Sequence, residues 1–282
     1  MAHVAFLGTG LLGSGLVEAM LRRGDIVTVW NRTEAKARRL ESLGARVAVT
    51  PADAVAGADR VHMTLPDDEV VDQMIGGFVG RLKPSAVIVD HSTTSPKGTK
   101  ARIERMEKSG VAFLHAPVFM SPQMARDAVG LMMVSGPQAL FDRIADDLKK
   151  MTGEVWYVGT RGDLAAAYKL FGNSMLFVIT AGLADVFAMA KANDVPLPDA
   201  VSVFDKFKVA NAISYRGQKM ARGDFDATFE LTMARKDMRL MLEAAAGHQT
   251  MVLAPIAKRM DEAIANGHGS HDLGAIAAEL VR

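Results

Sequence analysis

Apolar positions in the first 160 residues alternate between short continuous runs and stretches with helical spacing. The short runs predict strands at 3–7, 26–30, 46–49, 60–65, 86–90, 111–114, 130–135 and 155–158. The helical spacing predicts helices near 11–23, 52–57, 68–80, 96–109 and 137–150. Strands that alternate with helices in this way are typical of a mostly parallel sheet with helices on both faces, which is a doubly wound α/β domain.

The pattern becomes helical throughout after Gly159 and Gly162. Residues 163–192 form one long stretch dominated by Ala, Leu, Met and Phe. Shorter helical segments, separated by Pro and Gly, follow at 198–208, 212–221, 229–247, 252–265 and 272–281. No strand pattern occurs in this part. We therefore predict an α/β domain at residues 1–160 and an all-α domain at residues 161–282, led by a long helix.

A glycine motif lies between the first predicted strand and the first predicted helix. It consists of Gly8, Thr9, Gly10, Leu11, Leu12 and Gly13. Gly8 permits a tight turn, Gly10 lets the backbone approach a pyrophosphate, and Gly13 lets helix and strand pack closely. The following helix offers free N–H groups to the phosphates. With both strands in place, the motif predicts a Rossmann domain that binds a dinucleotide; the alternative is a glycine-rich turn in another α/β fold.

The end of the second predicted strand indicates which dinucleotide binds. An NAD site usually carries Asp or Glu there, to bind the ribose 2′-OH. This chain has Asn31, Arg32 and Thr33 instead. A guanidinium pairs with a 2′-phosphate that a carboxylate would repel, and neutral Asn and Thr add hydrogen bonds. Further basic residues follow on the next helix: Lys36, Arg38 and Arg39. We predict NADP(H) over NAD(H); the alternative is that Arg32 is an ordinary surface charge.

Composition narrows the class of protein. A chain of 282 residues with 49% apolar residues can form one large or two medium domains. It has no Cys, which excludes disulfides, thiolate catalysis and cysteine metal sites. The net charge of +1 indicates neither nucleic-acid nor membrane binding. No signal peptide precedes the first strand, so we expect a cytoplasmic protein. The apolar stretch 174–190 is interrupted by Asp185 and is expected to be a buried helix.

Polar residues cluster where several predicted strands end, which is the edge at which open α/β sheets bind ligands. The clusters begin at Thr64, Asp90 and His115. Ser92 and Thr93 are candidates to bind a nicotinamide or a substrate, and helix capping is an equally good explanation of them. His268 and His271 lie three residues apart, but no third ligand is evident and we predict no metal.

Two further candidates lie in the helical part. Lys169 and Asn173 share one helix face, which otherwise carries Ala and large apolar residues. A desolvated Lys has a lowered pKa and can exchange protons near neutral pH; the alternative is a Lys that snorkels at a domain interface. In the motif Phe229-x6-Lys236-Asp237, a Lys can reach a cofactor, but a solvated charge pair is the better explanation of Lys236 and Asp237.

Together these elements resemble the β-hydroxyacid dehydrogenase family. It includes 3-hydroxyisobutyrate dehydrogenase and the glyoxylate/succinic semialdehyde reductases, within the 6-phosphogluconate dehydrogenase superfamily. The glycine motif and Asn31-Arg32-Thr33 resemble its NADP-preferring fingerprint. The other matching segments are Leu65-Pro66-Asp67-Asp68 and Asp90-x-Ser92-Thr93 (cofactor loops), Ala116-Pro117-Val118 (substrate loop), Gly162-x6-Lys169-x3-Asn173 (catalytic helix) and Phe229-x6-Lys236-Asp237 (C-terminal cofactor contact).

The resemblance implies hydride transfer between NADP(H) and a small carbonyl or hydroxyacid substrate. Lys169 is then the general acid and base, and Asn173 orients it or the substrate. Cofactor contacts are implied at the glycine motif, Asn31, Arg32, Thr33, Thr64, Leu65, Pro66, Thr93, Phe229 and Lys236. Substrate contacts are implied at Ser92, Thr93, Val118, Phe119, Met120, Lys169, Asn173 and Asp237. The helical domain is implied to hold two copies together as a homodimer, with a tetramer left open.

The chain departs from the family pattern at two places. The substrate loop continues with Phe119-Met120-Ser121-Pro122 where the family usually has Ser-Gly-Gly, and Gly172 stands where many members have a second Asn. Both changes suggest a bulkier or less acidic substrate. His115, where the family often has Asp, has no clear interpretation. A loop with Met and Pro also resembles the imine reductases, which usually lack the lysine found here. A third hypothesis is an NADPH-binding protein without turnover, although Lys169 and Asn173 argue against it.

Overall fold

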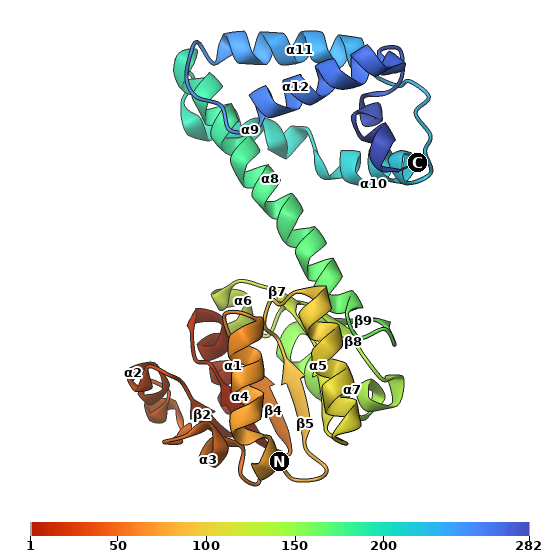
Figure 1. The fold of residues 1–282 in the computed structure, drawn as a ribbon. Helices are drawn as coiled ribbons and strands as arrows, with labels where there is room; N and C mark the ends of the chain where they lie inside the picture. The colour runs from red at the N-terminus through yellow and green to blue at the C-terminus, as the bar shows by residue number, and fades with distance from the viewer. Residues whose placement is uncertain (1, 282) are drawn as a thin grey trace. The chain divides into compact units, whose positions relative to one another are not determined.

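The computed structural model describes residues 2–281, and within this range nine strands form one sheet. Its order is β3-β2-β1-β4-β5-β6-β8-β7, with β9 paired to β8 (Figure 1). The strands are β1 (His3–Leu7), β2 (Ile26–Trp30), β3 (Arg46–Val47), β4 (Arg60–Met63), β5 (Val87–Asp90), β6 (Ala112–His115), β7 (Val118–Phe119), β8 (Gly130–Ser135) and β9 (Gly153–Gly159). β8 pairs antiparallel with β6 and β7 and parallel with β9, and the other pairs are all parallel, so the predicted mostly parallel sheet is confirmed.

Helices cover both faces of this sheet, because successive strand residues point to opposite sides. Val4 and Phe6 join a core with α1 and α7, whereas Ala5 and Leu7 join a second core with α3, α4 and α5. The helices are α1 (Leu11–Arg22), α2 (Glu34–Arg38), α3 (Pro51–Val55), α4 (Asp68–Phe78), α5 (Pro96–Lys108), α6 (Pro122–Arg126) and α7 (Gln138–Thr152), with short 3₁₀ turns at Glu41–Leu43 and Val79–Arg81. The doubly wound α/β prediction is therefore confirmed.

Two predicted strands are shorter than expected, and two short elements were missed. The strands expected at 46–49 and 60–65 end at Val47 and Met63, because the following residues turn away into loops. The segment expected to be a substrate loop instead contains β7 and α6. Phe119 pairs with Leu131 of β8, and Ser121 caps the short helix. A two-residue strand and a five-residue helix are too short to leave a periodic pattern in the sequence.

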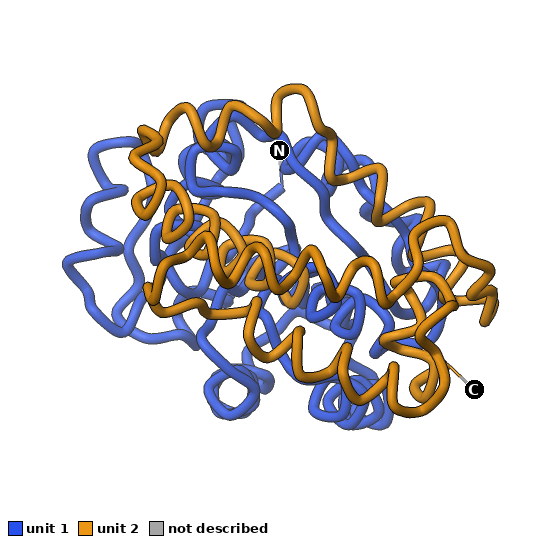
Figure 2. The backbone as a smooth tube through the Cα atoms, turned by 90° about the horizontal axis from the view of Figure 1, so that it is seen from above, with its two compact units in different colours: residues 1–173 blue, residues 174–282 orange. Residues whose placement is uncertain are grey.

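The chain divides into two compact units, Met1–Asn173 and Ser174–Arg282, which Figure 2 distinguishes by colour. The helix α8 (Leu164–Ala192) continues from the first unit into the second. The second unit also contains α9 (Leu197–Lys206), α10 (Ala210–Ala221), α11 (Leu231–Ala244), α12 (Leu253–Ala263), a π-helical turn (Ile264–His268) and a 3₁₀ helix (Leu273–Leu280). The all-helical C-terminal region is thus confirmed, and the predicted boundary at residue 160 stays a prediction.

A buried carboxylate organises the start of α12. Asp185 is 1% exposed and accepts hydrogen bonds from the backbone N–H groups of Met251 (2.5 Å), Val252 (2.9 Å) and Leu253 (3.0 Å). Burial alone would raise the pKa of Asp185, but these three donors hold it below its ordinary value. The charge that interrupts the apolar stretch of α8 therefore holds the N-terminus of another helix.

The expectation that residues 174–190 are buried is wrong for this chain. Leu176 is 55% exposed and Phe177 is 67% exposed, because the described residues leave this part of α8 largely uncovered. By length and composition, Leu164–Ala192 is the one helix in the described range that is apolar enough to cross a membrane. Such a single helix is weak evidence, since core helices pass the same test.

Candidate cofactor and catalytic site

The glycine motif adopts the tight turn and the close helix–strand packing that its sequence predicts. Gly8 has φ +96°, and a Cβ there would stand 2.3 Å from the carbonyl oxygen of Thr64. A Cβ on Gly13 would stand 2.0 Å from the carbonyl oxygen of Gly8. No atom lies within 4 Å of the Cβ position at Gly10. Gly8 and Gly13 are therefore required by the packing of the loop, and Gly10 leaves the open cradle that a pyrophosphate needs.

Hydrogen bonds fix the loop between the ends of β1, β2 and β4. The Thr64 hydroxyl donates to the Gly8 carbonyl oxygen (2.6 Å). The Thr9 N–H donates to Asn31 Oδ1 (3.0 Å), and Asn31 Nδ2 donates to the Thr33 carbonyl oxygen (2.9 Å). The side chain of Asn31 therefore holds the glycine loop. The helix α1 starts at Leu11 with no side-chain cap and no acidic residue in its first turn, so its N–H groups suit an anion.

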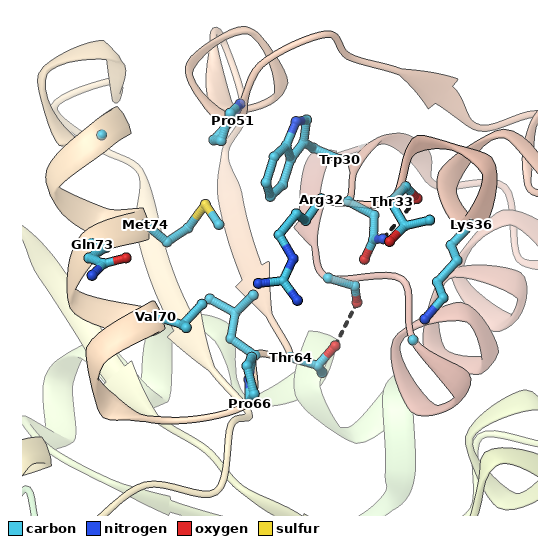
Figure 3. A pocket seen from close by; sticks show the side chains of 15 residues that line it. Trp30, Arg32, Thr33, Lys36, Pro51, Thr64, Pro66, Val70, Gln73 and Met74 are labelled. Carbon is cyan, nitrogen blue, oxygen red and sulfur yellow. Dashed lines mark hydrogen bonds between the residues drawn. The ribbon is translucent and has the colours of Figure 1, made fainter.

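A pocket of about 450 Å³ lies beside this loop, where the strand order of the sheet reverses. Figure 3 shows the Arg32 side chain reaching into it between Trp30 and Pro66. Its lining contains Arg32 and Lys36 but no carboxylate. Among the described residues, neither of these two cations makes a hydrogen bond or an ion pair. Apolar walls from Trp30, Pro51 and Met74, together with the basic side chains, fit an adenine ring and a 2′-phosphate.

A second pocket of about 360 Å³ continues along the strand ends from Gly10 to Thr93. Ser92 is 3% exposed, and its hydroxyl accepts the N–H of Leu65 (2.9 Å), so it joins two loops. Thr93 is exposed and makes no hydrogen bond with the described residues. Ser95, not Ser92 or Thr93, caps α5, through a hydrogen bond from the Gly98 N–H (3.0 Å). Thr93 is therefore the hydroxyl that remains open to a ligand.

A buried histidine pair lies directly behind this second pocket. His91 Nδ1 donates to the Ala116 carbonyl oxygen (2.7 Å), so its Nε2 accepts from His62 Nδ1 (2.9 Å). Burial lowers the pKa of His91 to about 4 and holds the pKa of His62 well below its ordinary value. Both imidazoles are thus neutral. The sequence alone does not reveal this pair, because no local pattern links β4 to the loop after β5.

Arg102 on α5 is a buried arginine that joins α5 to α4, and the sequence analysis did not identify it. Its side chain is fully buried, and it donates to Asp68 Oδ1 (2.9 Å) and to Asp72 Oδ1 (2.6 Å) on α4. Asp68 also accepts the Ser95 N–H (2.8 Å). The two cofactor loops predicted before α4 and α5 are therefore tied together. The spacing of Asp68 and Asp72, one helical turn apart, was the only signal in the sequence.

Asp90 and His115 are register partners at the ends of β5 and β6, and both are fully buried. His115 Nδ1 lies 3.6 Å from Asp90 Oδ2, and Arg102 Nη1 lies 3.9 Å from the same oxygen. Burial raises the pKa of Asp90, but His115 and Ser92 outweigh it and lower the pKa below its ordinary value. The position where the family often has Asp is here a buried imidazole beside a carboxylate.

Lys169 lies on α8 against the ring of Phe119, with Nζ 4.0 Å from the ring centroid. It is half-buried, and burial lowers the pKa of its ammonium. Asn173 is half-buried on the same helix face. A Cβ on Gly172 would stand 2.3 Å from Phe119 Cζ. The structure thus brings Lys169, Gly172 and Phe119 together, and both departures from the family pattern meet in one contact.

Val118, Ser121 and Pro122 of the predicted substrate loop make contacts within the fold, and the predicted substrate contacts of Val118 and Met120 stay predictions. Val118 is 4% exposed and belongs to the core around α1. The Ser121 hydroxyl accepts the Met124 N–H (3.2 Å) at the start of α6, and Pro122 is the first residue of that helix. A Cβ on Gly15 would stand 2.7 Å from the Pro122 carbonyl oxygen, so α6 packs closely on α1. Ser121 and Pro122 therefore serve the local fold.

In the second unit, Lys236 and Asp237 pair with each other on α11 (Nζ–Oδ1 2.8 Å). This is the solvated pair considered as an alternative, and their predicted ligand contacts stay predictions. The Phe229 N–H donates to Asp272 Oδ2 (3.2 Å). His268 Nδ1 and His271 Nδ1 lie 3.0 Å apart. Residues 2–281 contain no group of three or more His, Asp or Glu side chains that is able to hold a metal.

Comparisons with known proteins agree with this geometry. Residues 3–159 match the model of the NAD binding domain of 6-phosphogluconate dehydrogenase, and residues 164–280 match the NAD-binding model of NADP-dependent 3-hydroxyisobutyrate dehydrogenase. The cytokine-like nuclear factor N-PAC is 26% identical in Anopheles gambiae and 27% identical in Drosophila melanogaster, over 96% of this chain. The chain spans about half the length of these curated relatives, namely 49% and 46%.

Solved structures with the same fold include two reductases. An imine reductase from Myxococcus stipitatus in complex with NADP+ has a TM-score of 0.90 and 22% identity, over 99% of both chains. A reductive aminase from Aspergillus terreus in complex with NADPH and ethyl levulinate has a TM-score of 0.88 and 19% identity, over 99% of both chains. The model of the NAD binding domain of 6-phosphogluconate dehydrogenase covers more than half of the chain, so residues 3–159 form an NAD(P)-binding domain. The resemblance found in the sequence is confirmed. The chain belongs to the family defined by the NAD binding domain of 6-phosphogluconate dehydrogenase.

Proposed function

We propose that this protein is an NADPH-dependent oxidoreductase that interconverts a small carbonyl compound and its alcohol, with Lys169 as general acid and base. The observation that carries the proposal is a half-buried lysine whose pKa is lowered by burial, on the helix that follows a complete nicotinamide dinucleotide domain. A pure binding protein has no need of such a proton donor. The wall of the site near Lys169 is apolar because of Phe119, so the pocket is atypical for a hydroxyacid enzyme.

The choice of NADP(H) rests on the charge of the first pocket. Arg32 and Lys36 are free to pair with a 2′-phosphate, and the lining has no carboxylate to repel it. Asn31 is occupied with the glycine loop, so its role is to position Thr9 and Thr33. The open cradle at Gly10 and the uncapped start of α1 receive the pyrophosphate.

The chemistry of reduction then divides between cofactor and chain. When bound, the nicotinamide supplies a hydride to the carbonyl carbon. Lys169 donates a proton to the carbonyl oxygen as negative charge develops on it, which completes the alcohol. In the reverse direction, neutral Lys169 accepts the proton of the hydroxyl. Asn173, one turn along the same face, orients Lys169 or the substrate. Thr93 is open to bind either ligand.

A second candidate is an imine reductase or reductive aminase. It is favoured by the likeness of the fold to enzymes described by those names and by the apolar substrate wall. The substrate then carries C=N in place of C=O. Lys169 separates the two hypotheses, since only the carbonyl reductase depends on it for proton transfer. The third hypothesis, a protein that binds NADPH without turnover, predicts no substrate-dependent oxidation at all.

We also propose a cytoplasmic homodimer formed through the helical part, with a tetramer left open. The exposed apolar side chains along α8 support this assembly, because apolar patches of such extent usually mark a protein interface. A division into a cofactor domain at 1–160 and a substrate and dimerisation domain at 161–282 goes with the same proposal.

The test is NADPH oxidation by the purified protein, followed by nicotinamide absorbance. The substrate panel contains small oxoacids, semialdehydes, uncharged ketones and cyclic imines. We expect turnover of carbonyl compounds, and the Lys169→Met variant should lose about 10²–10⁴-fold in kcat/KM with little change in the Kd of NADPH. Lys191→Met, in the exposed last turn of the same helix, is the matched control and should keep full activity.

Three other outcomes would count against the proposal. Turnover confined to imines, with activity retained in Lys169→Ala, would favour the imine reductase. Tight NADPH binding without oxidation of any compound would favour the binding protein. Equal loss in the Lys169 and Lys191 variants would mean that the lysine acts only through the stability of α8.

A further inference from the structure

The ring of Phe119 and the backbone of Gly172 occupy complementary space. A Cβ on Gly172 would stand 2.3 Å from Phe119 Cζ, 2.9 Å from Cε1 and 3.1 Å from Cε2. Real Cβ atoms do not approach neighbours to 2.3 Å, so any other residue at this position of α8 requires the ring to move. Gly182, on the same helix, has no atom within 4 Å of its Cβ position. The Phe119 ring therefore fits against α8 in this position only because residue 172 has no side chain.

The same ring supplies one neighbour of the reactive ammonium. Lys169 Nζ stands 4.0 Å from the centroid, which is a favourable cation–π distance. Lys169 makes no hydrogen bond or ion pair with the residues in 2–281. The aromatic face thus orients the ammonium and leaves its N–H donors for an acceptor from outside the chain, such as a carbonyl oxygen.

The segment after Phe119 offers little to an anionic group. Met120 is apolar, and Pro122 has no N–H. The Ser121 hydroxyl caps α6, and the Ser121 N–H points to Met124 Sδ at 3.5 Å. A carboxylate held against this segment would lose its hydration and gain no charge partner from residues 120–122, which is unfavourable.

We propose that Phe119 and Gly172 form one specificity-determining pair that selects substrates without a carboxylate. The inference rests on the proposed function, since it names the substrate class of that same site. The ring fills the space beside α8, closes the segment 119–122 to anions and presents an apolar wall next to Lys169. A neutral ketone, aldehyde or ester-bearing carbonyl compound then binds better than its acid counterpart.

The first experiment tests whether the two positions are coupled, by thermal unfolding. Gly172→Ala should lower the midpoint by about 2–4 °C or more, although alanine normally favours a helix. The matched control Gly182→Ala should not lower it. In a Phe119→Ser background, Gly172→Ala should cause no further loss, because the clash is gone. Equal destabilisation by Gly172→Ala in both backgrounds would overturn the pairing.

The second experiment measures selectivity by binding. Levulinate and ethyl levulinate share one ketone and differ in the carboxylate, and their Kd values are measured by calorimetry with NADP+ present. The wild-type chain should bind the ester more tightly. Phe119→Ser/Gly172→Asn should shift the ratio toward the acid by about tenfold or more, and Phe119→Ser alone serves if the double variant does not fold. Tighter binding of the acid by the wild type, or an unchanged ratio, would overturn the proposal.

These measurements separate the pair from the proposed function. Unfolding and binding need no hydride transfer, so they judge the specificity pair even when no compound is turned over. Absence of turnover across the whole panel would instead refute the reductase.

Discussion

Arg32 is the residue whose charge distinguishes the two cofactors. Its side chain reaches into a pocket that holds no carboxylate, and it has no partner among the described residues. Asn31, the residue that stands where NAD sites carry an acid, already bonds Thr9 and Thr33. An acid at position 31 would therefore change the loop as well as the charge, so Arg32 is the cleaner position at which to test cofactor preference.

We expect Arg32→Ala to weaken NADPH binding and to leave NADH binding nearly unchanged. A lost guanidinium–phosphate pair corresponds to about 1.5–3 kcal/mol, or roughly ten- to a hundredfold in Kd. Fluorescence titration with both cofactors measures this difference. Arg81→Ala, at an exposed basic residue that does not line the pocket, is the matched control and should keep the wild-type ratio. A variant that binds both cofactors as the wild type does would make Arg32 a mere surface charge.

At the scale of elements, the sequence predicts helices and strands that carry their own apolar pattern, but it does not predict contacts between residues far apart in the chain. β1, α1 and β2 could be predicted because each carries its own apolar period, and Gly8 and Gly13 because they stand at the spacing of a known motif directly after β1. The ion pairs of Arg102 with Asp68 and Asp72 could not be predicted, because residues on two different helices share no periodic pattern in the sequence. The meeting of Phe119 with Gly172 was missed for the same reason. Phe119 and Gly172 were each identified as a departure from the family pattern, but their contact forms only in the folded chain.

The histidine link between β4 and the loop after β5 predicts acid sensitivity. His91 has a pKa of about 4 in the folded state, against about 6.5 in an unfolded chain. Between these values the unfolded chain binds more protons, so the free energy of unfolding falls as the pH drops from about 6.5 to 4. At 1.36 kcal/mol per pKa unit, His91 alone contributes a loss of about 3 kcal/mol over this window.

Urea unfolding at a series of pH values checks this expectation. His91→Asn keeps a donor for the Ala116 carbonyl oxygen but does not titrate, so its stability should fall less steeply over the window. His62 remains and preserves part of the slope. The exposed His248→Asn serves as control and should follow the wild type. A wild-type slope in the His91 variant would show that the pair does not govern acid unfolding.

At the scale of the whole molecule, α8 poses the main question. The described chain leaves a long apolar surface on this helix, including Leu176, Phe177, Val178 and Ile179. Water, a membrane or a second copy must cover it. Asp185, further along the helix, accepts backbone N–H groups at the start of α12 within the same unit, which ties this part of α8 to a second helix of the chain. We therefore propose that a second copy covers the apolar surface of α8.

We expect the purified chain to be a dimer in detergent-free buffer, and Phe177→Glu to raise the dimer Kd at least about tenfold, because a charge would be buried in the apolar interface. Sedimentation velocity over a concentration series gives both the mass and the Kd. Val49→Glu adds the same charge at a residue 89% exposed and away from α8, so it should leave the dimer intact. A wild-type monomer that partitions onto lipid vesicles, and that Phe177→Glu releases from them, would instead assign this surface of α8 to a membrane.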